Sequence, residues 1–135
     1  MLADMATSVE NGRNRKVLVV DDTEDVRFMI PLQLRTDGVT FEEAASGEEA
    51  LVRCGSEVFD AIVLDYRMPG LTGLDVAKRL QADNYPAQLV IYSAYVDESL
   101  ADDAQTLEIP VVDKADHGRL REVVRSALGL VEASR

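Results

Sequence analysis

Three acidic residues follow two apolar segments of the chain. Asp65 comes directly after residues 61–64, and Asp21 and Asp22 come directly after residues 17–20. If both segments are parallel strands, the carboxylates lie where such sheets bind ligands, outside the carboxyl ends of the strands. Three neighbouring anions repel one another, and a hard divalent cation is the usual way to neutralise them. The sequence therefore predicts a Mg²⁺ site.

A hydroxyl and an ammonium group follow two later apolar segments. Ser93 comes after residues 89–92, and Lys114 comes after residues 109–113. At the same sheet edge, these groups would join the three carboxylates. A carboxylate can attack a phosphoryl group and form an acyl phosphate, provided that the phosphoryl oxygens are neutralised. Lys114 and a divalent cation can supply that charge, and Ser93 can donate a hydrogen bond.

Strand-like and helix-like segments alternate from residue 16 onward. Strands are expected at 16–21, 39–43, 60–65, 88–92 and 109–112, and helices at 24–36, 47–55, 73–83, 97–106 and 116–128. This alternation predicts an α/β fold, in which helices cover both faces of a five-stranded parallel sheet. Right-handed crossovers favour the doubly wound, flavodoxin-like strand order 2-1-3-4-5.

The composition is that of one globular domain. A chain of 135 residues with 47% hydrophobic and 29% charged residues can bury a core of its own. We expect the domain at residues 15–130, with a flexible N-terminal tail at 1–14 and a C-terminal tail at 131–135. A net charge of −11 argues against binding to DNA or to anionic membranes. The sequence shows neither a membrane span nor a signal peptide, which favours the cytoplasm.

The chemistry-bearing residues occur in an order known from one family. The acidic pair, Asp65 before a Met-Pro-Gly turn, Ser93 before alanine, and Lys114 resemble the receiver domain of bacterial two-component response regulators. The resemblance covers about residues 15–130 and is closest to the stand-alone, chemotaxis-regulator-like type. It implies that Asp65 is the phosphoacceptor, that Ser93 is a switch hydroxyl and that Lys114 binds the phosphoryl group.

The resemblance also implies a cofactor and partners. Mg²⁺ would be bound by Asp22, Asp65 and the backbone carbonyl of Arg67, with Asp21 acting largely through water. The implied phosphodonor is a histidine kinase or histidine phosphotransfer protein, and the output is a downstream protein target rather than DNA. The chain would be a phosphoacceptor with Mg²⁺-dependent self-phosphorylation and slow autodephosphorylation, not an enzyme that acts on a separate substrate.

Two positions depart from the family pattern. Val111 stands where an aromatic residue usually lies, three residues before the lysine, and Ala115 replaces the proline that usually follows the lysine. A cis peptide bond is therefore not expected after Lys114, because such bonds are costly without proline. Without the usual aromatic residue, we expect the signal to leave through residues 93–112, with Tyr95 as its aromatic reporter.

The first expected helix is unusually apolar and contains Pro31, which should kink it. Phe28 and Leu32 are four residues apart and point away from the expected core stripe. Two interpretations remain open: they form a docking surface for a partner, or they pack under a neighbouring helix or loop.

Three other functions compete with that of a phosphoacceptor domain. A phosphatase of the haloacid-dehalogenase type needs an acid two residues after its nucleophile, where this chain has Arg67. A flavin- or nucleotide-binding module needs a Gly- or Ser/Thr-rich loop after the first strand, whereas residues 21–25 are mostly acidic. The chain could also be a receiver cut from a larger regulator, although an initial Met without a tag favours a stand-alone protein.

Overall fold

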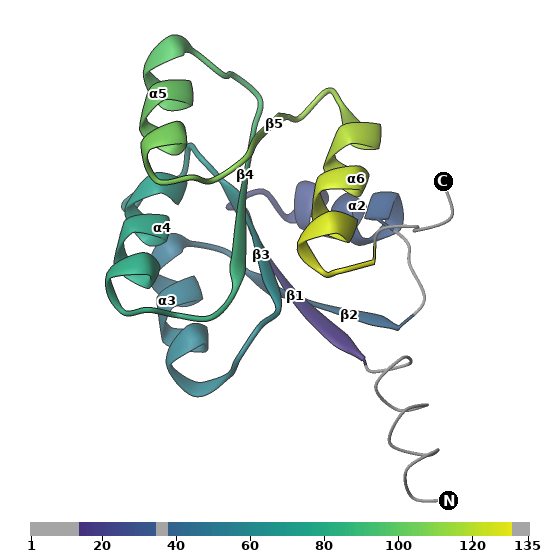
Figure 1. Cartoon of the computed structure of the whole chain (residues 1–135). Helices are drawn as coiled ribbons and strands as arrows, with labels where there is room; N and C mark the ends of the chain where they lie inside the picture. The colour runs from purple at the N-terminus through teal and green to yellow at the C-terminus, as the bar shows by residue number, and fades with distance from the viewer. Residues whose placement is uncertain (1–13, 35–37, 131–135) are drawn as a thin grey trace, which may run out of the picture.

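The chain forms one parallel β-sheet with helices on both of its faces (Figure 1). A computed structural model describes residues 14–34 and 38–130, so most of the two predicted tails lies outside the described residues. The strands are β1 (Arg15–Val20), β2 (Val39–Ala44), β3 (Ala61–Asp65), β4 (Gln88–Ser93) and β5 (Val111–Asp113). The helices are α2 (Glu24–Leu34), α3 (Gly47–Ser56), α4 (Gly73–Ala82), α5 (Glu98–Thr106) and α6 (His117–Ala127). The strand order is β2-β1-β3-β4-β5, which confirms the predicted fold class and topology.

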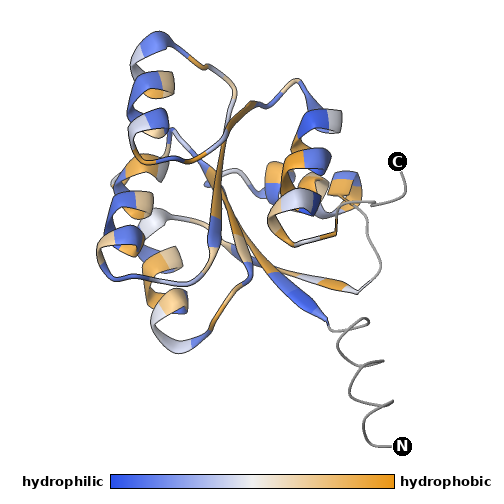
Figure 2. Cartoon of the chain, in the orientation of Figure 1, coloured by the Kyte–Doolittle hydropathy of each residue, from blue (hydrophilic) through white to orange (hydrophobic). Residues whose placement is uncertain are grey.

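Alternating apolar residues bury both faces of the central strands. Leu18 and Ile62 pack with α3, α4 and α5, whereas Val17 and Val63 pack with α2 and α6. In Figure 2 the central strands are mostly hydrophobic, whereas the helices that cover them carry both hydrophobic and hydrophilic residues. Each fully buried side chain of this kind contributes roughly 1.5–3 kcal/mol to folding. The sheet is therefore a rigid support for the groups at its carboxyl edge.

Four helices begin at side-chain caps close to that edge. The caps of α3, α4, α5 and α6 each accept a backbone hydrogen bond from the first turn and are, in order, Ser46, Thr72, Asp97 and Asp116. Such caps are typically worth ~1 kcal/mol each and fix where a helix starts. Among the described residues, no helix is both long enough and apolar enough to cross a membrane.

Most expected element boundaries lie within one residue of those in the structure, and the largest difference within the described residues is at the start of the fifth strand. The fifth strand was expected at 109–112, but β5 covers Val111–Asp113, because the N–H of Ile109 bonds back to Ala104 and closes the end of α5. The first helix continues through Pro31 and is described as far as Leu34. The last expected residues of that helix, 35 and 36, lie outside the described residues.

Candidate functional site

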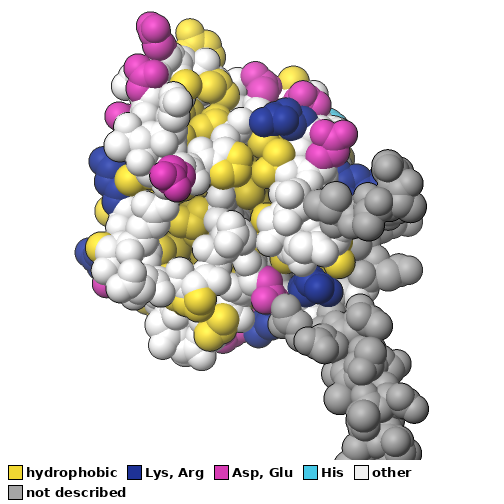
Figure 3. Space-filling model, in the orientation of Figure 1, with side chains coloured by type: hydrophobic (Ala, Val, Ile, Leu, Met, Phe, Trp, Pro, Cys, Tyr) yellow, Lys and Arg dark blue, Asp and Glu magenta, His cyan; other side chains and the backbone are white. Residues whose placement is uncertain are grey.

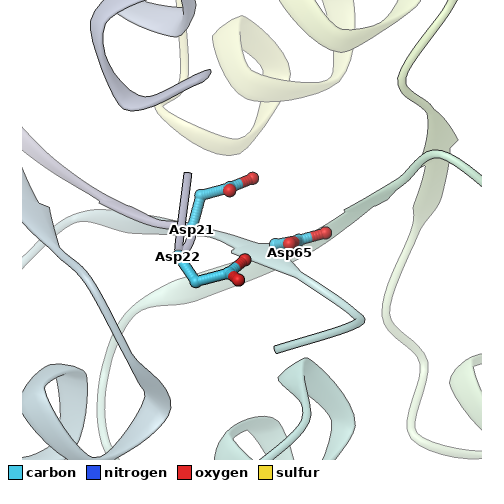
Figure 4. A group of neighbouring side chains, drawn as sticks. All are labelled: Asp21, Asp22 and Asp65. Atoms are coloured by element: carbon cyan, nitrogen blue, oxygen red, sulfur yellow. The ribbon is translucent and has the colours of Figure 1, made fainter. Parts of the chain in front are cut away.

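The strand register brings the three predicted carboxylates together. Val20 of β1 pairs with Leu64 of β3, so the residues that follow them, Asp21 and Asp65, are neighbours. One carboxylate oxygen from each of Asp21, Asp22 and Asp65 lies within 4.8 Å of the other two (Figure 4). Asp21 and Asp65 are buried and Asp22 is exposed, so the cluster opens to solvent on one side.

Lys114 reaches into the same cluster from the end of β5. Its Nζ lies 2.8 Å from Oδ2 of Asp21 and 3.1 Å from Oδ1 of Asp65. Its backbone N–H donates to the Ser93 carbonyl at 2.8 Å, which continues the pairing of β4 with β5. Burial lowers the pKa of Lys114, but the hydrogen bond to Asp21 and the charge of Asp65 outweigh it and raise the pKa above its usual value. Lys114 is therefore cationic at neutral pH.

The Asp65 carboxyl has a raised pKa. Burial and the charge of Asp21 raise its pKa to about 6, although Lys114 opposes the shift. With all groups ionised, three carboxylates face one ammonium group, and the site carries excess negative charge. The site offers carboxylate oxygens as metal ligands, and Mg²⁺ prefers such ligands, so the residues present fit this ion.

Asp21 is held by contacts that the sequence did not indicate. Its Oδ1 accepts a hydrogen bond from the N–H of Thr23 at 2.8 Å. Its carbonyl oxygen accepts from Nη1 of Arg27 at 2.7 Å, and Nε of Arg27 donates to Glu43 at 2.8 Å. Arg27 thus ties α2 to the ends of β1 and β2. In the sequence, Arg27 was visible as a basic residue inside a largely apolar helix, which is a hint that it makes such contacts.

Gly73 fixes the loop that follows Asp65. A Cβ atom at this position would lie 2.4 Å from the carbonyl oxygen of Asp65, so a larger residue does not fit without movement of the backbone. The N–H of Gly73 donates to the carbonyl of Tyr66 at 2.9 Å. The loop carrying Arg67 therefore turns back against the end of β3, while the Arg67 side chain is exposed. In the sequence, the hint of this close packing was a glycine directly after the Thr72 cap.

Ser93 ends β4, and its hydroxyl is engaged by the loop that follows. Its Oγ donates to the carbonyl of Tyr95 at 2.9 Å and accepts from the N–H of Tyr95 at 3.2 Å. The Ser93 side chain is buried, whereas Tyr95 is 66% exposed. A change in the orientation of this hydroxyl would release the backbone of Tyr95.

The two departures from the family pattern lie beside this loop. Val111 is half-buried and lines a groove of about 490 Å³, together with Val96 and Ala101 of the loop and α5. The peptide bond between Lys114 and Ala115 is trans, as expected for a non-proline residue.

Phe28 and Leu32 are exposed on α2, which begins three residues after Asp21. Their exposed fractions are 67% and 49%, and the neighbouring Met29 is 46% exposed. The interpretation that Phe28 and Leu32 pack under another helix or loop is therefore wrong for the described part of the chain. Together these three side chains form an exposed apolar patch, the α2 patch.

A larger groove than the one at Val111 lies at the other end of the sheet. It has a volume of about 1000 Å³ and is lined by the amino end of β4, by residues 108–110 before β5 and by α6. Figure 3 shows apolar side chains gathered in the hollow between α6 and the helices opposite it. The charged residues that line it are Glu108 and Glu122. Its residues do not form a reactive cluster, and we assign the chemistry to the acidic site.

Comparison with known proteins agrees with this geometry. The sequence model of the response regulator receiver domain matches residues 17–125. The chain is 35% identical over 85 residues to the alkaline phosphatase synthesis transcriptional regulatory protein PhoP of Bacillus subtilis (63% of this chain, 35% of the relative). It is 42% identical over 69 residues to the chemotaxis protein CheY of Pseudomonas aeruginosa (50% of this chain, 56% of the relative). The match thus spans about a third of the first relative and about half of the second.

One solved structure combines the fold with ions. The response regulator protein TrrA of Thermotoga maritima, in complex with Mg²⁺-BeF, superposes with a TM-score of 0.75. It is 30% identical to this chain, and the match covers 84% of this chain and 99% of that one.

Proposed function

The chain belongs to the response regulator receiver domain family, and on that premise we propose that Asp65 accepts a phosphoryl group in a two-component phosphorelay. The observation that carries the proposal is the contact of Lys114 with both Asp21 and Asp65 beside a trio of carboxylates. Receiver domains interact with histidine kinases or phosphotransfer proteins, and such a protein is the proposed phosphodonor.

The transfer is a displacement at phosphorus. An oxygen of the Asp65 carboxylate forms a bond to the phosphorus atom, and the bond from phosphorus to the donor breaks. The product is an aspartyl phosphate, and the donor leaves with the electron pair of the broken bond. Lys114 would neutralise the phosphoryl oxygens, and Ser93 would donate a hydrogen bond to one of them.

Receiver domains bind Mg²⁺ at an acidic pocket, and we propose Asp22, Asp65 and the carbonyl of Arg67 as its direct ligands here. Asp21 would act largely through water, because its carboxylate oxygens already accept from Thr23 and Lys114. When bound, Mg²⁺ would supply the positive charge that lets a phosphoryl dianion approach three carboxylates. The Mg²⁺-BeF complex of a 30% identical response regulator supports the choice of Mg²⁺ as the ion.

The test is incubation with acetyl phosphate, with Mg²⁺ or with a chelator, followed by intact-protein mass measurement. The wild-type chain should gain one phosphoryl group with Mg²⁺ and none without it. In this reaction acetate is the leaving group. The absence of any gain with Mg²⁺ would reject the proposed function.

The α2 patch is the proposed docking surface for the protein phosphodonor. Phe28, Met29 and Leu32 lie on the helix that starts beside the acidic pair, so a partner bound there stands next to Asp65. An exposed apolar patch of this kind fits the apolar stripe of a partner helix. A histidine kinase or phosphotransfer protein must bring its phosphohistidine to Asp65, at this edge of the sheet.

Changing Phe28 and Leu32 to Ser should slow transfer from a protein donor by at least about tenfold, the effect of losing apolar anchors from an interface. The donor is any histidine kinase or phosphotransfer protein that phosphorylates the wild-type chain. The rate with acetyl phosphate should not change, because this small donor needs no docking surface. Val52→Ser removes a 73% exposed apolar side chain from α3 and is the matched control. An equal loss with acetyl phosphate would contradict the docking role.

The proposed output surface is the segment 93–112. If the hydroxyl of Ser93 turns toward a phosphoryl oxygen, both of its bonds to Tyr95 are lost, and the loop before α5 is free to move. α5 is anchored by two buried side chains, Leu100 and Ala104, and has the open groove at Val111 beside it. A helix with few buried contacts is a low-stability element that a local change can reorder.

Amide chemical shifts with Mg²⁺ and beryllofluoride, a phosphoryl mimic, test this switch. We expect changes in residues 94–107 as well as near Asp65, with Tyr95 among the largest. In Ser93→Ala, beryllofluoride should change the shifts near Asp65 but not those of 94–107. A wild-type response confined to residues 65–70 would contradict the switch.

Four further expectations from the sequence concern the output, the location and the domain limits. A downstream protein target, the absence of direct DNA binding, a cytoplasmic location and the domain limits 15–130 all stay predictions. The family match at residues 17–125 lies within those limits.

A further inference from the structure

Tyr92 lies inside β4, directly before Ser93, and is 3% exposed. In the register of the sheet it pairs with Asp65 on β3 and with Val112 on β5. It therefore stands between the strand of the proposed phosphoacceptor and the strand that leads to Lys114.

Two contacts join Tyr92 to Lys114. The phenol hydroxyl donates a hydrogen bond to the carbonyl oxygen of Lys114 at 3.1 Å. The ammonium nitrogen of Lys114 lies 5.8 Å from the centroid of the Tyr92 ring, within the range of cation–π attraction. A buried tyrosine usually needs a partner for its hydroxyl, and here that partner is the residue that contacts Asp21 and Asp65.

The main chain of Lys114 is tied to β4 at both of its polar groups. Its N–H donates to the carbonyl of Ser93, and its carbonyl accepts from the Tyr92 hydroxyl. The next residues, Ala115 and Asp116, are exposed. The first hydrogen bond joins two backbone groups, whereas the second depends on the side chain of Tyr92.

We propose that Tyr92 is a positioning residue for phosphoryl transfer: its hydroxyl and ring hold Lys114 where the ammonium group meets the phosphoryl oxygens. The inference rests on the proposed function of Asp65. Tyr92 acts through Lys114 and does not itself touch the phosphoryl group. Its hydroxyl also restrains the backbone after Lys114, where Ala115 lacks the rigid ring that a proline would provide.

Tyr92→Phe keeps the ring and removes the hydroxyl. The rate of phosphorylation by acetyl phosphate should fall about two- to tenfold, the range expected for one lost hydrogen bond. The affinity for beryllofluoride at saturating Mg²⁺ should fall by a similar factor. The affinity for Mg²⁺ alone should stay at the wild-type value, because Lys114 is not among the proposed metal ligands.

Tyr85→Phe is the matched control. Its hydroxyl donates to the carbonyl of Glu57 at 2.7 Å and accepts from the N–H of Phe59 at 2.9 Å, at the opposite end of the sheet. It should lower the melting temperature but leave the phosphorylation rate and the beryllofluoride affinity unchanged. A Tyr92→Phe variant that likewise loses only stability would overturn the positioning role.

A double variant shows whether the effect passes through Lys114. In a Lys114→Gln background, Tyr92→Phe should not weaken beryllofluoride binding further, since coupled residues are not additive. An additional loss equal to that in the wild-type background would contradict the proposal. A wild-type chain that takes up no phosphoryl group would reject the proposed function and this role with it. Normal uptake by both wild type and Tyr92→Phe would reject the role of Tyr92 alone.

Discussion

Asp65→Asn is expected to take up no phosphoryl group from acetyl phosphate under conditions in which the wild-type chain takes up one. The amide lacks the anionic oxygen that attacks phosphorus, so the displacement cannot begin. The substitution is nearly isosteric, and Lys114 keeps its contact with Asp21 at 2.8 Å, so the fold should persist. Intact-protein mass before and after incubation measures the result, and the wild-type adduct should be labile in acid.

Two further variants separate the nucleophile from its surroundings. Asp22→Asn keeps the nucleophile and removes a proposed Mg²⁺ ligand, so uptake should slow and recover at higher Mg²⁺ concentration. Asp103→Asn makes the same change of charge on an exposed part of α5 and should behave like the wild type. Stoichiometric uptake by Asp65→Asn would show that another residue is the acceptor.

The sequence was enough to predict the sheet and the acidic cluster, and the reason is physical. Strands buried on both faces must be almost wholly apolar, so a carboxylate at the end of such a segment marks the end of the strand. Parallel strands share a carboxyl edge, which brings Asp21 and Asp65 together without any knowledge of side-chain contacts. The structure agrees, since Val20 and Leu64 are paired.

Features that depend on register and on backbone hydrogen bonds were not predicted. Ile109 reads as part of an apolar strand, but its N–H closes the end of α5, and β5 begins two residues later. Tyr92 likewise reads as one more large residue in a strand. Its role depends on a carbonyl 22 residues away, which no local pattern indicates. Gly73 was visible as a glycine, but its close approach to Asp65 was not.

The second large effect concerns stability, because Asp65→Asn should stabilise the metal-free protein while it abolishes uptake. The Asp65 side chain is 8% exposed, and burial and Asp21 raise its pKa to about 6. Compared with an unfolded carboxyl group near pKa 4, this costs the folded state on the order of 2–3 kcal/mol at neutral pH. Asn carries no charge and avoids this cost. The melting temperature should rise by roughly 3–5 °C for each kcal/mol regained.

The advantage of Asp65→Asn should depend on pH in one direction. Above about pH 6, Asp65 is ionised in both the folded and the unfolded chain, and the full cost is present. Between about pH 6 and 4 the folded chain takes up its proton before the unfolded chain does, so the cost shrinks. Below about pH 4 both states are protonated, and the variant and the wild type should have similar stability. A difference that grew as the pH fell would contradict the raised pKa.

Mg²⁺ should reduce this difference in stability by binding the folded wild-type chain. At a concentration some tens of times its Kd, a ligand adds ~2 kcal/mol to the free energy of unfolding. The melting temperature of the wild type should therefore rise toward that of Asp65→Asn, which lacks one carboxylate and should respond less. NaCl of equal ionic strength controls for screening of the carboxylates. Asp103→Asn should show the full Mg²⁺ response, because its charge lies outside the cluster of Asp21, Asp22 and Asp65. If Mg²⁺ stabilises the wild type no more than NaCl does, the carboxylates do not form a metal site, and their repulsion must be relieved by Lys114 alone.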